Sequence, residues 1–579
     1  MYCRKPLVAL GVWLALAGCA KQPAGWERLA ILPFENLSGD AGVDWMGRGV
    51  AEALCLQLAG APRVHAFPVG SLRETAVERA TQVLQGYLWR AGGRVRAEAV
   101  LEDVASGRMV KWLAASGETV APLARALAGA LGWPARAFGA SQDAALRAYV
   151  RGLEATQARV AAEAFQAAVT VEPDFAAAYV AWAERLAAAG DGAGARQVIA
   201  RAGARGERIP ALERARLAVL AARLGGDQAA QQQAWRALAQ AAPAQAEVFE
   251  RLAESEVASS RYPEAVRSYE QAAARDPDDA LLLNQLGYAR CFARDLAGAV
   301  RSLQRYRVLR TEEANPLDSL GDVHYYLGRF AEAEKYYLAA WGKDAGFLGG
   351  GEPYKAAWAR LMQGDRQGAD EHFQRYLEAR RASGDPLVEL RRAQWEYLTG
   401  RQREARARLE GRSETAAWVQ LTVWKLDEGD RKRARECAAR AAAAARDPAA
   451  GLMARLSQYL AGEEAGAAEW VARAERAFPS SAESMLRRAA LAYALLLTRQ
   501  YAAALPALEE LHARTPSSAN EPTNVLLAWA LIQTGRGSEV GELLDWYPAP
   551  QPGAEQPFAC LSFPRVLQLR EMRQGALKH

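Results

Sequence analysis

Small and large apolar residues recur along most of the chain with the spacing of paired helices. The clearest units begin at Ala246, Ala280 and Ala314, which are 34 residues apart. Within each unit the apolar positions fall three or four residues apart, which is the period of an amphipathic helix. Small residues stand where the two helices of a hairpin would cross closely, and larger residues stand where they would fill the gap to the next hairpin. The pattern predicts a series of stacked helical hairpins.

The three units carry similar residues at equivalent positions. The first has Phe249, Leu252, Ala253, Ala265, Tyr269, Ala272 and Pro277. The second has Leu283, Leu286, Gly287, Ala299 and Leu303, and the third has Leu317, Leu320, Gly321, Ala333, Tyr337 and Ala340. This series resembles the tetratricopeptide repeat (TPR), whose period is about 34 residues. Less regular units extend the array over residues 142–547. Because one hairpin cannot bury its apolar face alone, the resemblance implies a TPR-type α-α superhelix, a solenoid with one continuous core.

Residues 26–138 show a different pattern. Short apolar runs bounded by turn residues predict strands at 28–34, 64–69, 83–90, 95–104 and 109–113. Runs with helical spacing predict helices at 43–58, 72–79 and 120–131. Strands and helices in this order favour a small α/β layer domain. The whole chain is therefore predicted to be mostly α, with a small N-terminal α/β domain ahead of the repeats.

Three segments of the α/β region form a motif. The first is the run from Ile31 to Asp40, Ile-Leu-Pro-Phe-Glu-Asn-Leu-Ser-Gly-Asp. The other two are a helix with Gly49, Glu52 and Leu54 and a hairpin with Gly86, Arg90, Gly93, Val95 and Arg96. Together they resemble the TolB amino-terminal-like domain, over about a fifth of the chain. That family often accompanies kinase, cyclase or DNA-binding modules, whereas here an export signal precedes the domain. The resemblance implies interaction rather than chemistry, and no catalytic residue.

Residues 1–19 have the order of a bacterial export signal. Basic residues stand at positions 4 and 5, and the apolar run from Leu7 to Ala17 is too short to span a bilayer. The run ends in Leu-Ala-Gly-Cys at Cys19, which resembles the lipobox of bacterial lipoproteins. The resemblance implies that Cys19 carries the lipid. Since Ala20 rather than Asp follows, it also implies the outer membrane, facing the periplasm. The alternatives are an ordinary secretion signal and a buried helix that ends in a cysteine.

Composition and net charge bear on the kind of partner that the protein binds, and cysteine spacing bears on its disulfides. Of the 579 residues 51% are hydrophobic and 24% charged, which are ordinary globular values, and a net charge of +5 is close to neutral for this length. A nucleic acid is therefore not expected as a partner. Cys55, Cys291, Cys437 and Cys560 show no CxxC spacing, so they are expected to be buried small hydrophobic residues, with a disulfide as the alternative.

The sequence contains none of the common catalytic motifs, such as a P-loop, HExxH or GxSxG. Its five histidines are scattered and show no metal-ligand spacing. The run from Gly190 to Gly194 resembles a phosphate loop only superficially, because it follows no strand and falls between two predicted helices. We therefore expect no enzyme activity, no cofactor and no metal.

The predicted binding site is the inner face of the repeat array. In a solenoid the first helix of each hairpin lines the concave face, where peptides or partner helices bind. The inward positions of the second and third units are Asn284, Tyr288, Phe292, Asp318, Asp322, Tyr325 and Tyr326. The Asn284 amide is expected to hold an extended backbone, and the tyrosines are expected to supply contact area. The alternative is that these tyrosines only pack between repeats.

These features predict a non-catalytic, lipid-anchored periplasmic TPR scaffold for protein–protein interaction in cell-envelope assembly. Its contact with the membrane would be the lipid anchor only. The alternative function is a regulatory or sensor module of a signalling system, related to TolB-like or TPR kinases and cyclases. Residues 548–579 are expected to form a tail that caps the last hairpin, with a docking peptide as the alternative.

The substitution Cys19→Ser tests the anchor. We expect it to release the protein from membranes, because each acyl methylene buried in the bilayer contributes about 0.8 kcal/mol to membrane binding. Membrane fractionation and the apparent mass of the protein, which shows whether the signal has been removed, are the measurements. Cys3→Ser, which lies within the predicted signal, should leave the distribution unchanged. A Cys19→Ser protein that stays in the membrane fraction with its signal uncut would contradict the lipobox interpretation.

Overall fold

The computed structural model describes residues 25–462, 489, 492–493, 495–496, 499–514, 523–544 and 569. The predicted signal with Cys19 lies outside the described residues, as does the predicted tail apart from Leu569. The chain divides into two compact units. Unit 1 is Met1–Ser255 with Ser268–Asp278, and unit 2 is Glu256–Arg267 with Asp279–His579.

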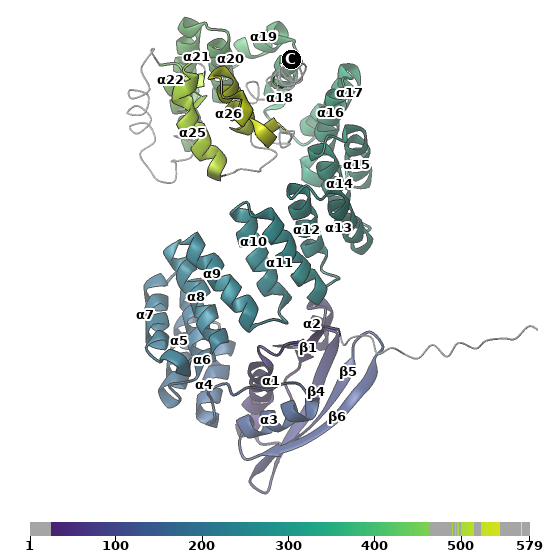
Figure 1. The fold of residues 1–579 in the computed structure, drawn as a ribbon, viewed down its shortest axis with the longest axis vertical. Coiled ribbons are helices and arrows are strands. Elements are labelled where there is room, and N and C mark those ends of the chain that lie inside the picture. The colour runs from purple at the N-terminus through teal and green to yellow at the C-terminus, as the bar shows by residue number, and fades with distance from the viewer. Residues whose placement is uncertain are drawn as a thin grey trace, which may run out of the picture. The chain divides into compact units, whose positions relative to one another are not determined.

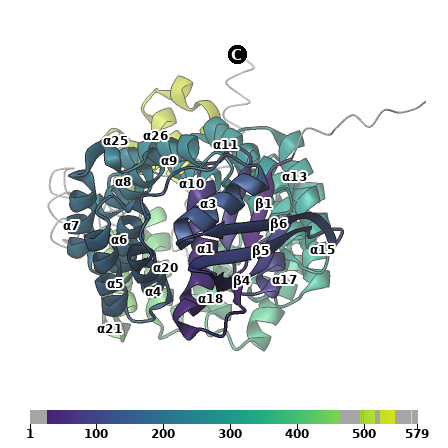
Figure 2. The same ribbon diagram turned by 90° about the horizontal axis from the view of Figure 1, so that it is seen from below.

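A mixed β-sheet forms the centre of the α/β domain, at the beginning of unit 1 (Figure 1). Its strands are β1 (Glu27–Ile31), β2 (Glu35–Asn36), β3 (Val64–Pro68), β4 (Gln82–Ala91), β5 (Arg94–Asp103) and β6 (Arg108–Gly117). The order is β3-β1-β4-β5-β6, with β2 beside β4. The pairs β1–β3, β1–β4 and β2–β4 are parallel, whereas β4, β5 and β6 form an antiparallel meander. Figure 2 shows these three strands side by side.

One face of this sheet packs against helices. Helices α1 (Asp44–Leu58) and α3 (Val120–Leu131) contact each other, and α3 also contacts β6; α2 (Leu72–Val77) follows β3. Alternate residues of β5 are buried on this face, namely Val95, Ala97, Ala99 and Leu101. This period of two is what a sheet covered on one side requires.

The elements of the domain follow the predicted order, with two differences. Strand β1 ends at Ile31, before the predicted end at 34, and Pro33, which has no N–H to donate to a ladder, separates it from the short strand β2. Strand β6 continues to Gly117, beyond the predicted end at 113, because Ala114 to Ser116 pair with β5 although they carry no apolar alternation.

Helical hairpins make up the rest of unit 1. The helices are α4 (Asp143–Glu154), α5 (Ala158–Val171), α6 (Ala176–Ala188), α7 (Gly192–Gly203), α8 (Ala211–Gly225) and α9 (Gln228–Ala241). Two further helices, α10 (Ala246–Ala258) and α11 (Tyr262–Arg275), have residues in both units. Within unit 1 the helices contact each other in sequential pairs, α4 with α5, α6 with α7 and α8 with α9.

Unit 2 continues with the same kind of hairpin. Its helices are α12 (Ala280–Phe292), α13 (Leu296–Leu309), α14 (Asn315–Tyr326), α15 (Phe330–Lys343), α16 (Glu352–Met362), α17 (Arg366–Ala382), α18 (Val388–Leu398), α19 (Gln402–Glu410), α20 (Thr415–Asp427), α21 (Arg431–Ala444), α22 (Pro448–Leu460), α25 (Tyr501–Arg514) and α26 (Thr523–Gln533). The predicted fold class, mostly α with TPR-type hairpins after a small α/β domain, is confirmed.

An aspartate begins the second helix of five described hairpins. Each carboxylate accepts a hydrogen bond from the backbone N–H three residues further on, which satisfies a donor that the helix leaves free. These residues are Asp191, Asp227, Asp295, Asp365 and Asp430. In the Gly190–Gly194 run Asp191 therefore caps α7, and the run is a turn between helices as predicted.

Glycine allows the two helices of a hairpin to cross closely. A Cβ atom on Gly287 would lie 2.6 Å from Leu303 Cδ2, and one on Gly321 would lie 2.6 Å from the Tyr337 ring. Both partners come from the second helix of the same hairpin and are fully buried. These contacts match the small and large positions of the predicted repeat.

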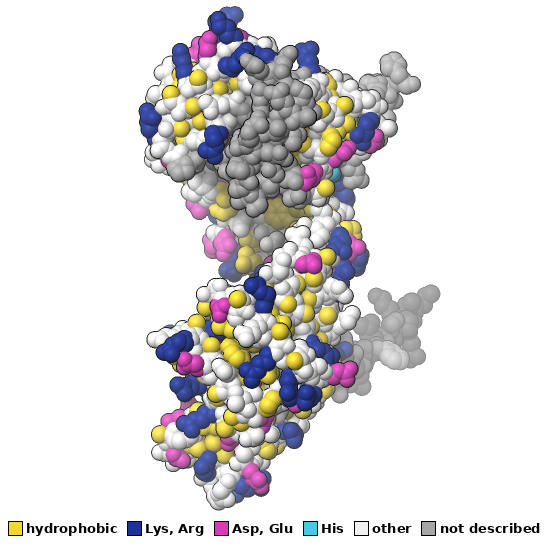
Figure 3. All heavy atoms as spheres, turned by 90° about the vertical axis from the view of Figure 1, so that its left-hand side faces the viewer, with side chains coloured by type: hydrophobic (Ala, Val, Ile, Leu, Met, Phe, Trp, Pro, Cys, Tyr) yellow, Lys and Arg dark blue, Asp and Glu magenta, His cyan; other side chains and the backbone are white. Residues whose placement is uncertain are grey.

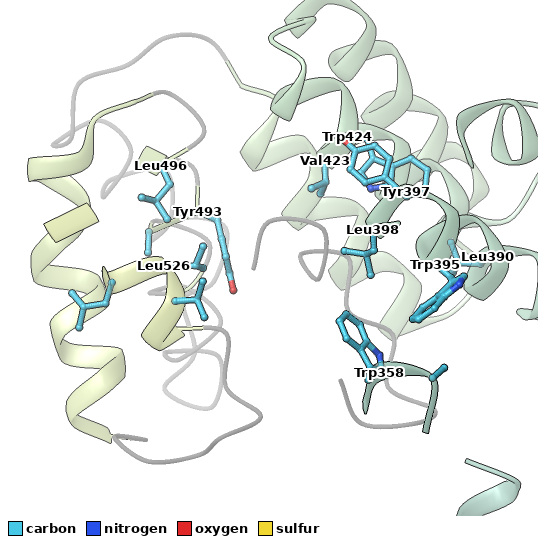
Figure 4. Close-up of a cluster of buried hydrophobic side chains, with 14 of the residues drawn as sticks. Trp358, Leu390, Trp395, Tyr397, Leu398, Val423, Trp424, Tyr493, Leu496 and Leu526 are labelled. Atoms are coloured by element: carbon cyan, nitrogen blue, oxygen red, sulfur yellow. The ribbon is translucent and has the colours of Figure 1, made fainter. Parts of the chain in front are cut away.

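Aromatic residues fill the core of the later hairpins (Figure 4). Tyr397 and Trp424 stack with ring centroids 4.3 Å apart, and Phe373 and Trp395 stack at 4.5 Å. Trp358 meets Trp395 edge to face at 5.7 Å. Pairs of this kind add to the free energy gained by burial alone.

The described cysteines are buried free thiols. Cys55, Cys291 and Cys437 are buried as their spacing led us to expect, while Cys560 lies outside the described residues. Burial raises the pKa of the Cys291 thiol to about 12, so it stays protonated. Within the described part of the chain, no helix combines the length and apolar character needed to cross a bilayer.

Arg28 joins the α/β domain to the hairpin of α10 and α11 within unit 1. Its side chain is 4% exposed, and its Nη1 lies 3.0 Å from Glu247 Oε1 and 3.5 Å from Asp276 Oδ2. Its Nε and Nη2 donate to the carbonyl of Glu78. Arg79 also pairs with Asp276, at 2.8 Å. These five residues form what we call the Arg28 network, which fastens a repeat to the sheet domain.

The substitution Gly321→Val tests the helix crossing. We expect a loss of about 1–3 kcal/mol in the free energy of unfolding of unit 2, because the added carbons have no space beside the buried Tyr337 ring. Gly342→Ala is the matched control, because a Cβ added at Gly342 in α15 would have no atom within 4 Å, and it should be neutral or slightly stabilising. Hydrogen exchange in α14 and α15 measures both effects. Equal protection in the two variants would contradict the predicted repeat register.

Candidate protein-binding site

The seven residues of the predicted site lie on two neighbouring first helices of unit 2. Helix α12 carries Asn284, Tyr288 and Phe292 at intervals of four residues, so they share one face of the helix. Helix α14 carries Asp318, Asp322, Tyr325 and Tyr326. The two helices contact each other, and the Tyr288 hydroxyl reaches Asp322 across them. The structure therefore brings the two sets together.

The residues differ in their exposure. Asn284, Tyr288, Phe292 and Asp322 are half-buried, although the Oδ1 atom of Asn284 is itself buried. Asp318 and Tyr326 are buried. Tyr325 is fully buried and packs edge to face against Phe330 at 5.3 Å, so its predicted place on the binding face is wrong. The alternative interpretation, packing between helices, holds for this tyrosine.

An aromatic row lies along the face of α12. Phe292 is its central ring, and the Tyr262, Tyr288 and Tyr326 rings have centroids 5.3, 6.4 and 6.2 Å from it. Tyr262 belongs to α11, and no feature of the sequence pointed to its place in this row. Rings of this kind offer large contact areas with few rotatable bonds, which limits the entropy lost on binding.

Asp322 is the centre of a hydrogen-bond cluster between the helices. Its Oδ2 accepts a hydrogen bond of 2.9 Å from the Tyr288 hydroxyl. Its Oδ1 accepts hydrogen bonds from the Tyr337 hydroxyl and from Lys355 Nζ, also at 2.9 Å. Lys355 in addition donates to Asp318. The cluster therefore fixes the orientation of Tyr288, the aromatic residue at the centre of the α12 face.

Lys355 and Glu352 complete this cluster from α16. Burial lowers the pKa of Lys355, but the charges of Asp322 and Asp318 outweigh it, and the net pKa lies well above the usual value. Burial and the charge of Asp318 raise the pKa of Glu352 to about 9. Neither oxygen of the Glu352 carboxyl accepts a hydrogen bond from the described residues. At neutral pH Glu352 is therefore protonated and able to donate to Asp318.

Burial and the neighbouring Asp322 also raise the pKa of Asp318, to about 6. The cluster thus gathers three acidic side chains, Asp318, Asp322 and Glu352, around the single ammonium group of Lys355. On the face in Figure 3, Lys and Arg side chains lie among Asp and Glu side chains instead of forming a stripe.

The sequence did not point to Glu352 or Lys355. The three glycines Gly349–Gly351 interrupt the 34-residue period just before α16, so α16 matched no signature position. Tyr337 was recognised only as a packing residue. Its hydroxyl, at the end of a ring that fills the hairpin, has the second role of holding Asp322.

Comparison with known proteins gives no family. No protein-family model and no curated protein matches the chain. The resemblance of residues 31–40 to the TolB amino-terminal-like domain therefore stays a prediction.

Solved structures that resemble parts of the chain are TPR proteins. The C-terminal part of a TPR repeat-containing protein from Cytophaga hutchinsonii is 17% identical, over 41% of this chain and 92% of that one, with a TM-score of 0.33. YrrB, described as a TPR protein with an unusual peptide-binding site, is 18% identical over 40% and 99%, with a TM-score of 0.27. PilF from Pseudomonas aeruginosa is 16% identical over 37% and 94%, also at 0.27. These values assign no partner to the chain.

The substitution Glu352→Gln tests the cluster through the pH dependence of the protein's stability. The folded carboxyl holds its proton up to a pKa of about 9, against an ordinary value of 4.5, so the folded state binds more protons in that interval. Stability must then fall as the pH rises from 4.5 to 9, by at most about 1.4 kcal/mol per pH unit. Between about pH 7 and 9 we expect protection of α14 and α16 amides, corrected for intrinsic exchange, to decrease in the parent chain and much less in Glu352→Gln.

Glu371→Gln is the control for this measurement. Glu371 lies exposed on α17, so its substitution should leave the parent pH dependence intact. A parent and a Glu352→Gln protein with the same pH dependence would show that Glu352 is not the buried protonated acid.

Proposed function

We propose that this protein is a non-catalytic scaffold that binds other proteins through the first helices of its repeats. The observation that carries the proposal is the α12–α14 face, where Asp322 holds Tyr288 and the aromatic row leaves Phe292 accessible. A face whose side chains are already held loses less conformational entropy on binding. The aromatic rings would supply contact area, and the half-buried Asn284 amide would bind a partner's backbone.

The polar cluster supports a binding role over a catalytic one. Lys355 is held as a cation by Asp318 and Asp322, so its amine is neither a free base nor a nucleophile. Among the described residues, no three side chains of the types that bind metals are grouped to hold an ion. The scaffold would therefore act through its surface.

The proposed location is the cell envelope. It rests on residues 1–19, which would place a lipid on Cys19 and hold the protein at the outer membrane, facing the periplasm. Envelope assembly is the corresponding process, because a tethered scaffold raises the local concentration of partners at the membrane.

A regulatory module of a signalling system is the second candidate. The Arg28 network favours it, since buried charges join the TolB-like sheet domain to the α10–α11 hairpin. A ligand that bound to the sheet domain and disrupted the Arg28 network would also change the conformational equilibrium of the α10–α11 hairpin.

Site-specific photo-crosslinking in the native host tests the proposed site. A benzoylphenylalanine in place of Phe292 or Asn284 should crosslink to a discrete partner, because both side chains are partly accessible on the α12 face. The same group in place of Val308 is the control, since Val308 is 68% exposed on the second helix of the same hairpin. An envelope-assembly component as the partner supports the scaffold, and a kinase or cyclase supports the regulatory module. Identical patterns at positions 292, 284 and 308 would contradict the site.

A further inference from the structure

The face of the sheet away from α1 and α3 carries two exposed aromatic side chains. Tyr87 of β4 is 49% exposed and Trp112 of β6 is 56% exposed. Exposed apolar side chains that gather on one face mark partner-binding surfaces, whereas single exposed ones are ordinary. This face belongs entirely to the α/β domain of unit 1, so it is separate from the α12–α14 face.

Strand register places two carboxylates beside these rings. Tyr87 stands opposite Glu35 of β2 on one side and opposite Glu98 of β5 on the other. Residues directly opposite one another point to the same side of a sheet. Glu98 itself stands opposite Ala114 of β6, two residues from Trp112, and the small Ala114 side chain leaves the space between the rings open. An acid, a tyrosine and a second acid thus lie in one row, with the tryptophan diagonal to it.

A cavity of about 210 Å³ opens at this point of the sheet. Its lining includes Glu35, Tyr87, Glu98 and Trp112, and Leu32 and Val100 contribute apolar surface. The lining therefore combines two negative groups with aromatic and aliphatic surface. That combination is complementary to a cation that has a flat apolar face.

Neither carboxylate is neutralised within the described part of the chain. No ion pair joins Glu35 or Glu98 to any residue that the structure describes. Arg96 precedes Glu98 by two residues on the same face of β5, and no described ion pair joins the two. Glu102 further along β5 differs, because it accepts a hydrogen bond of 3.0 Å from Gln85. Glu35 and Glu98, the two acids that stand opposite Tyr87, are therefore available to pair with a cationic ligand.

We propose that this cavity binds an arginine side chain presented by a partner protein. A guanidinium group is planar and stacks on the faces of tyrosine and tryptophan rings. Its edge donates paired hydrogen bonds to carboxylates, which Glu35 and Glu98 would accept. A lysine ammonium is a strongly hydrated point charge without a flat face, so it would interact less favourably with the two aromatic rings. The site recognises one basic residue and is independent of the proposed function of the repeats.

Selection of peptides on the full chain tests this inference. A library of random twelve-residue peptides is selected on the parent protein and then counter-selected on Trp112→Ala and on Tyr87→Ala. Because both side chains are exposed, these variants should fold, which an unchanged thermal melt will show. We expect the peptides that depend on Tyr87 and Trp112 to share an arginine.

Affinities of the selected peptides decide the chemistry. Replacing the shared arginine with citrulline, which keeps the shape and removes the charge, should weaken binding by about tenfold or more, and lysine should also bind less well. Glu98→Gln and Glu35→Gln should weaken binding of the arginine peptide and leave the citrulline peptide unaffected. Met109→Ala is the control, since Met109 is 64% exposed on β6 but does not line the cavity. Site-dependent peptides without arginine, equal affinity for citrulline, or no peptide that depends on Trp112 would each overturn the proposal.

Discussion

The close crossing of two helices within each hairpin is the constraint on which the repeat structure depends. Gly152, Gly287 and Gly321 leave no room for a side chain beneath Phe165, Leu303 and Tyr337. Because the helices cross so closely, each of these large side chains fills the space between the two helices of its own hairpin. It also presents an apolar surface to the next hairpin. The contact between α12 and α14 is a consequence, because the same pitch sets Tyr288 one repeat before Asp322 and lets a hydroxyl meet a carboxylate across two helices.

Much of the fold could be predicted because it follows from short-range periodicity in the positions of apolar residues. The 34-residue spacing located α10 to α15, and alternation in the N-terminal region located β3, β4 and β5. Errors arose where a local rule was overridden. Strand β1 ended at Ile31, earlier than its apolar run indicated, and pairing with β5 extended β6 through residues that carry no apolar signal.

The sites were harder to predict because they depend on partners far apart in the sequence. Glu352 and Lys355 follow a glycine interruption, and their role comes from Asp318 and Asp322 in the preceding hairpin. Tyr325 lies on the same helix as Asp318 and Asp322 of the predicted site, but its side chain points the other way and packs against Phe330. Likewise, the row of Glu35, Tyr87 and Glu98 depends on strand register, which composition does not reveal.

The Arg28 network has a mechanical consequence. Pulling the α10–α11 hairpin away from the sheet would first have to separate the Arg28 guanidinium group from the Asp276 carboxylate while both are still nearly inaccessible to water, and breaking a buried ion pair is costly. TPR arrays with free ends can stretch and recoil, because each repeat contacts only its neighbours. In unit 1 the sheet domain works as a brace instead, so the first hairpins should resist extension until this charged joint gives way.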